Sequence, residues 1–376
     1  MKLLFLIGTP REAITLGPII RAARSGAQAL EVSVCLTGER RQGLDAALAT
    51  FEICASRELS VSPPDATPTQ LVAWMIEPLD QVLAAEQPDW LIVHGDTTTA
   101  MVGSLAAYYR RVPIAHVEAG VRSHDKYSPH PEEINRRVAD LLADLHFAPT
   151  EHAQRSLLDE GVDAKRILVT GNPGIDALHH ALQIDCDVKR GPLASVPFEK
   201  RVVVVSAHAY EDFGGSLEDI CNAVRQLASQ YDSDIHIVYV TPSHSGLYEM
   251  IDAALGDLQN VTLTPPLEYV SFVHLLNRAQ LVLTDSGGIH EEATSLGKPV
   301  LLLSSVTERI EALDEGTAKV VGTDPAGIVK ETRLLLDDKS AYAAMARPSK
   351  LYGDGRAASR ICYEILHREE HGRNVA

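Results

Sequence analysis

The feature that most constrains the fold of this chain is a series of short, continuous apolar segments that alternate with longer segments of helix length. Six lie in the first half of the sequence, at residues 2–8, 31–38, 90–96, 114–120, 145–150 and 167–171. Six more lie in the second half, at 201–208, 235–242, 261–266, 279–286, 299–305 and 318–323. Continuous apolar strands alternating with helices are typical of parallel sheets covered on both faces. The sequence therefore predicts an α/β fold with two Rossmann-like sheets.

A chain of 376 residues is too long for one ordinary core, so two domains are expected. We predict Rossmann-like domains at 1–182 and 201–355, joined by a linker at 183–200 that lacks periodicity and carries Gly, Pro and mixed charge. Residues 356–371 form a predicted terminal helix, and the pattern leaves open whether it packs back on the first domain. Ligands of such sheets bind at the carboxyl ends of the strands, so we expect the site in a cleft between the domains.

Composition narrows the functional classes. The net charge of −17 argues against broad nucleic-acid binding and against attachment to an anionic membrane surface, although a local basic pocket can still bind an anionic small molecule. Five scattered cysteines without a CxxC spacing indicate free thiols in a reducing compartment. The first apolar run is too short for a signal peptide, and no run reaches the length of a membrane span. We therefore expect a cytoplasmic protein.

Polar side chains follow four of the predicted strands at the point where each strand ends. They are Asp96 in "LIVHGDTTT", Glu118 in "IAHVEAG", His208 in "VVVVSAH" and Asp285 in "LVLTDSGG". Because the carboxyl ends of parallel strands meet at one edge of a sheet, these are candidate site residues. The usual spacings of a metal site and the GxSxG motif of a serine hydrolase are both missing.

The stretch "TDSGGIHEEATSLGKP" is a candidate phosphate site. Gly287 and Gly288 allow close approach of a ligand to the backbone, and the segment Ser286-Gly287-Gly288 leads into a predicted helix whose first N–H groups favour an anion. We expect Glu292 on the first helical turn, where it could accept hydrogen bonds from ribose hydroxyls. An ordinary helix start with acids that complement the helix dipole explains the same residues, and the stretch alone does not decide.

Three further segments carry four candidate site residues, and in each segment an ordinary structural role explains the same residues. Arg309 could bind a diphosphate or orient a carboxylate, or could lie on a surface helix. Arg11 follows a proline suited to a helix start and could reach the cleft or remain on the surface. Glu132 and Arg136 follow two prolines in "YSPHPEEINRR", where acids in the first turn and bases later are also a common helix start.

Taken together, these motifs resemble one family over nearly the whole chain. The chain is similar to the non-hydrolysing bacterial UDP-N-acetylglucosamine 2-epimerases. The segments that carry the resemblance are "HGDTTTAMVGSLAAYYRRVPIAHVEAGVRS", "YSPHPEEINRR", "LHFAPTE", "ILVTGNPGIDAL", "LTDSGGIHEEATSLGKPVL", "TERIEAL" and "YGDGRAASRI". The resemblance implies two Rossmann-like domains in the arrangement of GT-B glycosyltransferases, a homodimer, and no metal, NAD or prosthetic group.

The resemblance also implies a reaction and a set of roles. Members of the family invert C2 of UDP-GlcNAc to give UDP-ManNAc, by eliminating UDP to 2-acetamidoglucal and adding it back. That reaction needs carboxylates as acid and base and cationic stabilisation of the departing diphosphate. The implied catalytic residues are Asp96, Glu118, Glu132 and His208. The implied UDP-binding residues are Ser286, Gly287, Gly288 and Glu292, with Arg136 beside the second glutamate.

Three segments depart from the family pattern. In "GTPREAIT" arginine and proline are transposed and Thr15 replaces a lysine; in "HAYED" Ala209 and Tyr210 replace two arginines; and "GERR" at 38–41 replaces a Gln-His pair. We infer that regulation by substrate is lost or altered. The departures also leave open a hydrolysing epimerase that releases ManNAc and UDP, an epimerase of a related sugar nucleotide, a GT-B glycosyltransferase and a non-catalytic binder.

Overall fold

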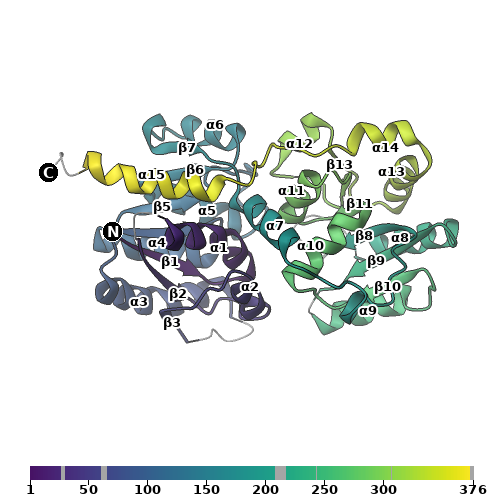
Figure 1. Cartoon of the computed structure of the whole chain (residues 1–376), viewed down its shortest axis with the longest axis horizontal. Helices are drawn as coiled ribbons and strands as arrows, with labels where there is room; N and C mark the ends of the chain where they lie inside the picture. Colours follow the sequence, from purple (N-terminus) through teal and green to yellow (C-terminus); the bar gives the residue numbers. More distant parts are fainter. Residues whose placement is uncertain (27–29, 61–65, 208–216, 243, 306, 373–376) are drawn as a thin grey trace. The chain divides into compact units, whose positions relative to one another are not determined.

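The computed structural model describes residues 1–26, 30–60, 66–207, 217–242, 244–305 and 307–372. The chain divides into two compact units (Figure 1): unit 1 comprises Met1–His179 and Tyr352–Ala376, and unit 2 comprises His180–Leu351. Each unit contains one parallel sheet with helices on both faces. The predicted α/β fold with two Rossmann-like sheets is confirmed.

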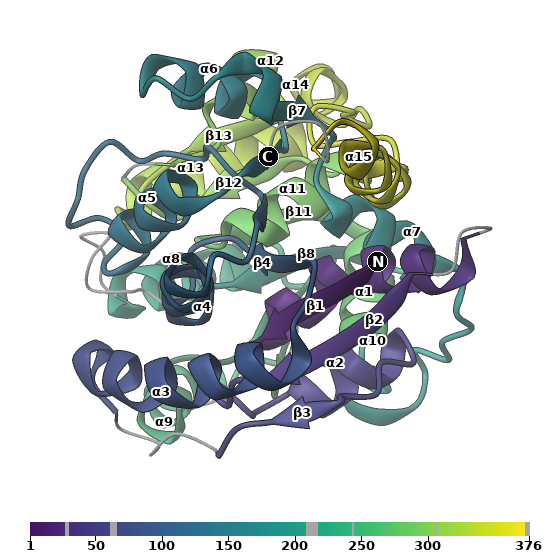
Figure 2. The same ribbon diagram turned by 90° about the vertical axis from the view of Figure 1, so that its left-hand side faces the viewer.

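Unit 1 contains a seven-stranded sheet in the order β3-β2-β1-β4-β5-β6-β7. Every strand pair is parallel, and Figure 2 shows β1 and β2 side by side. In chain order the strands are β1 (Lys2–Ile7), β2 (Glu31–Leu36), β3 (Arg57–Glu58), β4 (Trp90–His94), β5 (Ile114–Val117), β6 (Leu145–Ala148) and β7 (Ile167–Val169). The helices are α1 (Pro10–Ser25), α2 (Leu44–Thr50), α3 (Pro68–Glu86), α4 (Thr98–Arg110), α5 (Glu132–Leu142), α6 (Glu151–Asp159), η1 (Ala164–Arg166), α7 (Pro173–Gln183, which continues into unit 2) and α15 (Ala357–Gly372).

Unit 2 contains a six-stranded parallel sheet in the order β10-β9-β8-β11-β12-β13. The strands are β8 (Arg201–Ser206), β9 (Ile235–Val240), β10 (Val261–Thr264), β11 (Ala279–Thr284), β12 (Val300–Leu302) and β13 (Ala318–Val320). The helices are η2 (Gly191–Leu193), α8 (Leu217–Gln230), α9 (Ser245–Leu255), α10 (Tyr269–Arg278), α11 (Gly287–Ser295), α12 (Ile310–Glu315), α13 (Pro325–Asp337) and α14 (Lys339–Met345).

Both sheets reverse their strand order at the same place. The chain lays down three strands outward from β1 or β8 and then returns to the other side of that first strand with β4 or β11. A doubly wound sheet binds its ligand beside such a reversal, at the carboxyl ends of the strands. The loops that follow β1 and β4, and those that follow β8 and β11, therefore carry the candidate sites.

Most strands are rich in apolar residues, as expected where helices cover both faces of a sheet, whereas the short edge strand β3 is charged and exposed. In unit 1, Leu4 and Leu6 pack with the apolar faces of α3 and α4 in one cluster. Alternate residues of β1 such as Phe5 are also fully buried, on the opposite face. In unit 2, α8, α9 and α13 cover one face of the sheet.

The terminal helix α15 belongs to unit 1, where it lies against α1 (Figure 1). The thiol of Cys362 lies 3.6 Å from the carbonyl oxygen of Ile19. At the start of α15, the carboxylate of Asp176 accepts hydrogen bonds from the backbone N–H groups of Ala357 and Ala358, at 3.1 and 3.0 Å. Within the described ranges, no helix combines the length and apolarity needed to cross a membrane.

Candidate active site

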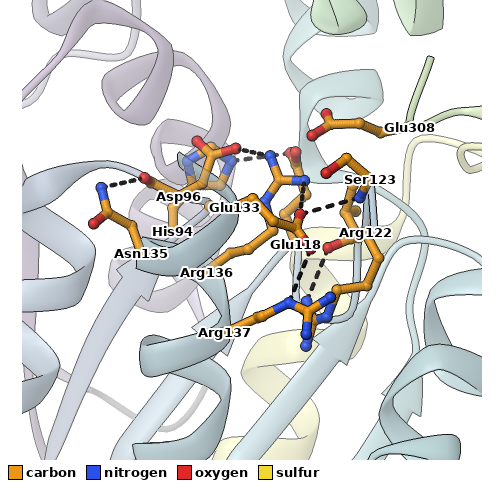
Figure 3. A network of polar contacts seen from close by, with 12 residues as sticks. His94, Asp96, Glu118, Arg122, Ser123, Glu133, Asn135, Arg136, Arg137 and Glu308 are labelled. Carbon is orange, nitrogen blue, oxygen red and sulfur yellow. Dashed lines mark hydrogen bonds and ion pairs between the residues drawn. The ribbon is translucent and has the colours of Figure 1, made fainter. Parts of the chain in front are cut away.

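Asp96 lies just beyond β4, in the turn that leads into α4. Its carboxylate forms an ion pair with the guanidinium of Arg136, which is almost fully buried on α5, while 33% of the Asp96 side chain is exposed (Figure 3). The side-chain amide of Asn135 donates to the Asp96 carbonyl oxygen at 3.0 Å. Two predicted site residues, Asp96 and Arg136, are thus in direct contact.

Glu118 follows β5 in a left-handed backbone conformation, with φ of 67°. A non-glycine residue rarely adopts this conformation, and it persists only where its surroundings fix it. Here the backbone N–H groups of Glu118 and Ala119 both donate to the carbonyl oxygen of Phe147, at 3.1 and 3.2 Å. Oε2 of Glu118 lies 3.1 Å from Nε2 of His94 and 3.0 Å from Nδ2 of Asn172. Neither His94 nor Asn172 was predicted, although both lie within quoted motifs.

A buried charge cluster supports the turn that carries Glu118. Asp140 accepts from the backbone N–H of Gly120 at 3.2 Å, lies 2.7 Å from Nδ1 of His116 and forms a 2.7 Å ion pair with Arg122. Burial raises the pKa of Asp140, but His116 and Arg122 outweigh burial and hold the pKa at about 2. Nε2 of His116 contacts the Gly95 carbonyl oxygen at 2.8 Å, so the cluster joins the turns after β4 and β5.

Glu132 is the first residue of α5, and Pro131 occupies the N-cap. The next residue, Glu133, is fully buried and has a different task. Its carboxylate pairs with Arg136 at 3.3 Å and Arg137 at 2.9 Å and accepts from the backbone of Ser123 at 3.0 Å. Glu133 therefore fixes the start of α5 and aligns Arg136.

Arg11 is the second residue of α1, after Pro10 at the first position. Its guanidinium lies over the first turn of α7: a Cβ on Gly174 would lie 3.3 Å from Nη2 of Arg11 and 3.2 Å from Oδ1 of Asn172. Arg11 thus reaches the neighbourhood of Asn172, the residue that contacts Glu118. Asp96, Glu118 and Arg136, three of the residues predicted in unit 1, are thus tied to this edge by their contacts.

Two carboxylates that the sequence did not single out cap the helices at this edge. Glu12 accepts from the backbone N–H groups of Gly8 and Thr9 at 2.7 and 2.8 Å, and from the Thr97 hydroxyl at 2.6 Å. Glu39 accepts from the backbone N–H of Thr99 at 2.8 Å. Burial and the nearby Glu39 raise the pKa of Glu12 to about 8. A capping-box pattern, Thr9 to Glu12, was the available sequence signal.

In unit 2, α11 begins at Gly287, and its N-cap Ser286 makes no capping hydrogen bond with its side chain. The guanidinium of Arg309 lies directly against this first turn, since a Cβ on Gly287 would meet its Cζ at 2.9 Å. Nε of Arg309 donates to Oε1 of the buried Glu291 at 2.8 Å, which fixes the guanidinium. A helix start without a side-chain cap, next to a fixed arginine, provides both elements of an anion site.

Glu292 and His208 are two further residues predicted for the site in unit 2. Glu292 lies on the second turn of α11, not the first as expected, because the helix begins at Gly287. It is buried, and its Oε1 lies 3.4 Å from the hydroxyl of Tyr269. His208, with Ala209 and Tyr210, lies outside the described residues. Among the residues that are described, no group of three His, Cys, Asp or Glu side chains is placed to hold a metal ion.

Comparison with known proteins gives a consistent result. Residues 23–366 match the family described as UDP-N-acetylglucosamine 2-epimerase. The UDP-N-acetylglucosamine 2-epimerase of Escherichia coli K12 is 44% identical over 367 residues, which cover 96% of this chain and 97% of that protein. A probable UDP-N-acetylglucosamine 2-epimerase of Ralstonia solanacearum is 42% identical over 370 residues, covering 97% and 98%.

Solved structures agree over the same span. The UDP-GlcNAc 2-epimerase of Neisseria meningitidis bound to UDP-GlcNAc superposes with a TM-score of 0.93 at 36% identity, covering 98% of this chain and all of that one. The S. aureus MnaA–UDP structure gives a TM-score of 0.91 at 40% identity, with 98% and 97% covered. Family match, near-complete coverage and shared fold lead to one conclusion: the chain belongs to the UDP-N-acetylglucosamine 2-epimerase family.

Proposed function

We propose that this protein is an isomerase that interconverts UDP-GlcNAc and UDP-ManNAc by eliminating UDP to 2-acetamidoglucal and adding it back. The observation that carries the proposal is the edge of the unit 1 sheet, where the carboxylates of Asp96 and Glu118 follow neighbouring strands and are held by side-chain contacts. Asp96 pairs with Arg136, and Oε2 of Glu118 contacts His94 and Asn172. The names of the relatives point to the same reaction.

The chemistry requires a proton to leave C2 on one face of the sugar and to return on the other. A carboxylate takes the C2 proton, the C2–H electron pair forms the C1–C2 double bond, and the C1–O bond breaks with its electrons going to UDP. Re-addition of UDP and protonation of C2 from the opposite face complete the inversion. We assign this acid–base work to Asp96, Glu118 and Glu132, with His208 as a further catalytic residue.

We assign the UDP to unit 2. The first turn of α11, with Ser286, Gly287 and Gly288, offers backbone N–H groups to the diphosphate, and Arg309 beside it offers a cation. Glu292 remains our candidate for the ribose hydroxyls. In unit 1, Arg11 and Arg136 are candidate contacts of the substrate.

We also propose a cytoplasmic homodimer. Large apolar side chains stand exposed on α4 and α5: Tyr108, Tyr109, Ile134 and Leu141, the last 81% exposed. Exposed apolar side chains gathered on packed helices are typical of an interface. All five cysteines are free thiols, as suits a reducing compartment.

The test is proton NMR of the protein with UDP-GlcNAc in D₂O. We expect deuterium at C2 and the appearance of UDP-ManNAc. If free ManNAc and UDP are the products, the protein is a hydrolysing epimerase and not a reversible one. An unchanged spectrum over hours at micromolar protein would refute the proposal for this substrate. Sedimentation of wild type against Leu141→Glu tests the homodimer separately.

A further inference from the structure

The described contacts of the Glu118 carboxylate come from two elements that are distant in the sequence. His94 is the last residue of β4 and is paired in register with Val117, the residue before Glu118. Asn172 lies in the turn before α7. Both reach the same oxygen, Oε2, at 3.1 and 3.0 Å. The backbone of Glu118 is held by the Phe147 carbonyl, and these two contacts hold Oε2 of its carboxylate.

The hydrogen bonds of Asn172 determine the orientation of its amide. Oδ1 accepts from the backbone N–H of Gly174 at 2.9 Å, so Nδ2 is the atom that faces Glu118. The backbone N–H of Asn172 donates in turn to the carbonyl oxygen of Tyr352 at 2.6 Å. Asn172 is therefore a fixed neutral donor.

His94 is a second donor. An ionised carboxylate only accepts hydrogen bonds, so Nε2 of His94 carries the hydrogen in this contact. Nδ1 is buried and has no hydrogen-bond partner among the described residues. The hydrogen bond of this ring within the described part of the chain is therefore the one to Glu118.

Hydrogen bonds affect the charge state of a carboxylate. Donors to a carboxylate favour its ionised form, which suits a base that takes a proton from the substrate. Loss of such a donor therefore makes the carboxylate easier to protonate before the substrate binds.

We propose that His94 is the positioning residue that directs the Glu118 carboxylate at the sugar and keeps it ionised until it accepts a proton. The proposal deepens the proposed function and rests on it, because it requires Glu118 to act on C2. The ordinary alternative is a buried histidine that only fills space at the end of β4. The neighbouring elements carry charged and titratable groups, and the variants below leave all of them in place. They include Arg11 and Glu12 on α1, Asp96 after β4, His116 on β5, Arg122, Glu132, Glu133, Arg136, Arg137 and Asp140 on and before α5, and Asp176 on α7.

The experiment compares His94→Leu, which removes the donor, with His94→Gln, whose amide restores one. His236→Gln is the matched control, since His236 is also a buried strand histidine, with Nε2 2.7 Å from the Thr262 hydroxyl in unit 2. The readouts are the rate of C2 hydrogen exchange with UDP-GlcNAc in D₂O between pH 5.5 and 9, KM, and UDP affinity by calorimetry.

We expect His94→Leu to lower kcat about 10- to 100-fold, as misplacement of a catalytic group does. Its acid limb should move to higher pH, because loss of a donor raises the pKa of the carboxylate, with KM and UDP affinity changed less than threefold. His94→Gln should recover most of both effects, and His236→Gln should show neither. If His94→Leu does not fold, His94→Asn, whose amide is too short to reach Oε2, replaces it.

Two outcomes overturn the proposal separately from the proposed function. In the first, the wild type exchanges the C2 hydrogen, the Leu and Gln variants lose the same fraction of kcat, and the acid limb does not move. That result would show that His94 only fills space. Wild-type exchange with no loss in either variant would remove any role. If the wild type itself exchanges no hydrogen, the proposed function fails and this proposal fails with it.

Discussion

In each unit a helix follows the strand at which the strand order reverses. The residues at the start of that helix have different chemistry in the two units. In unit 1 the strand that follows the reversal of strand order is β4, and α4 follows it; in unit 2 the equivalents are β11 and α11. The start of α4 is occupied by the protein itself: the Thr97 hydroxyl accepts from Ala100 N–H at 3.0 Å, and the Glu39 carboxylate accepts from Thr99 N–H. The start of α11 has no side-chain cap from Ser286 and lies beside an arginine.

This difference shows how one fold supports two tasks. A helix N-terminus attracts anions wherever it occurs. In unit 1 the protein's own carboxylates take that place, so the edge is rich in acids, while in unit 2 the glycines and Arg309 leave it suited to a phosphate. The site residues, and not the fold, therefore divide the work into proton transfer and nucleotide binding. Four substitutions test this division, from the largest expected effect to the smallest.

Glu118→Gln should separate chemistry from binding most clearly. Gln keeps the shape but cannot take a proton, so C2 exchange should fall by about 10²- to 10⁴-fold. UDP affinity, assigned to unit 2, should change less than twofold by calorimetry. A parallel loss of UDP affinity would show that the two units do not divide the work as proposed.

Asp140→Asn tests the buried cluster that supports the unit 1 edge. Removing one charge of a buried pair leaves Arg122 and His116 less compensated and should destabilise unit 1 by about 3 kcal/mol. Both tryptophans, Trp74 and Trp90, lie in unit 1, so urea unfolding followed by their fluorescence reports on that unit.

The control for this change is Asp80→Asn, which breaks an exposed pair with Arg110 on the surface of the same unit. Exposed pairs contribute about 1 kcal/mol or less. Equal destabilisation by the two substitutions would contradict a special role for the Asp140 cluster.

Gly287→Ala tests nucleotide binding in unit 2, whereas Glu118→Gln tests proton transfer in unit 1. The added Cβ would meet the Arg309 guanidinium at 2.9 Å and push it away from the first turn of α11. Loss of one charge-assisted contact should weaken UDP binding about 10- to 100-fold. Gly246→Ala is the control: that glycine also lies in the first turn of a unit 2 helix, α9, and the nearest atom to an added Cβ is an ordinary contact with His244 at 3.4 Å. Unchanged UDP affinity in Gly287→Ala would show that the diphosphate does not bind at the start of α11.

Glu12→Gln should produce the smallest effect, visible as a pH dependence. Because the pKa of Glu12 is raised to about 8 in the folded protein, the folded state holds a proton that the unfolded chain releases near pH 4.5. Wild-type stability should therefore fall as pH rises from about 5 to 8. Gln keeps the capping box and has no titration, so its Tm should fall a few degrees less over that range. In Glu39→Gln the pKa of Glu12 should be raised less, so the pH range over which stability falls should be narrower. Identical profiles of Tm against pH in all three proteins would contradict the raised pKa of Glu12.

The capping residues show where sequence reasoning stopped. Thr9 and Glu12 form a local pattern, yet nothing local says that the Thr97 hydroxyl, 85 residues away, would complete the contacts of Glu12. The predicted place of Glu292 was wrong because the helix was expected to begin after the glycine pair, whereas α11 begins at Gly287, two residues earlier. Glu132 and Glu133 are adjacent acids with the same local signal, and only packing distinguishes the buried Glu133 from its neighbour.

The sequence by itself determined the two parallel sheets, because continuous apolar strands must be covered on both faces. It also determined that acids and glycines follow particular strands, since the ends of strands are fixed by local pattern. Only the tertiary structure decided which acid pairs with which partner: Asp96 with Arg136, 40 residues away, and Glu118 with His94 and Asn172. Those pairings join side chains from different strands and helices, and the charge state of a carboxylate depends on the groups within a few ångströms of it in space, wherever they lie in the sequence.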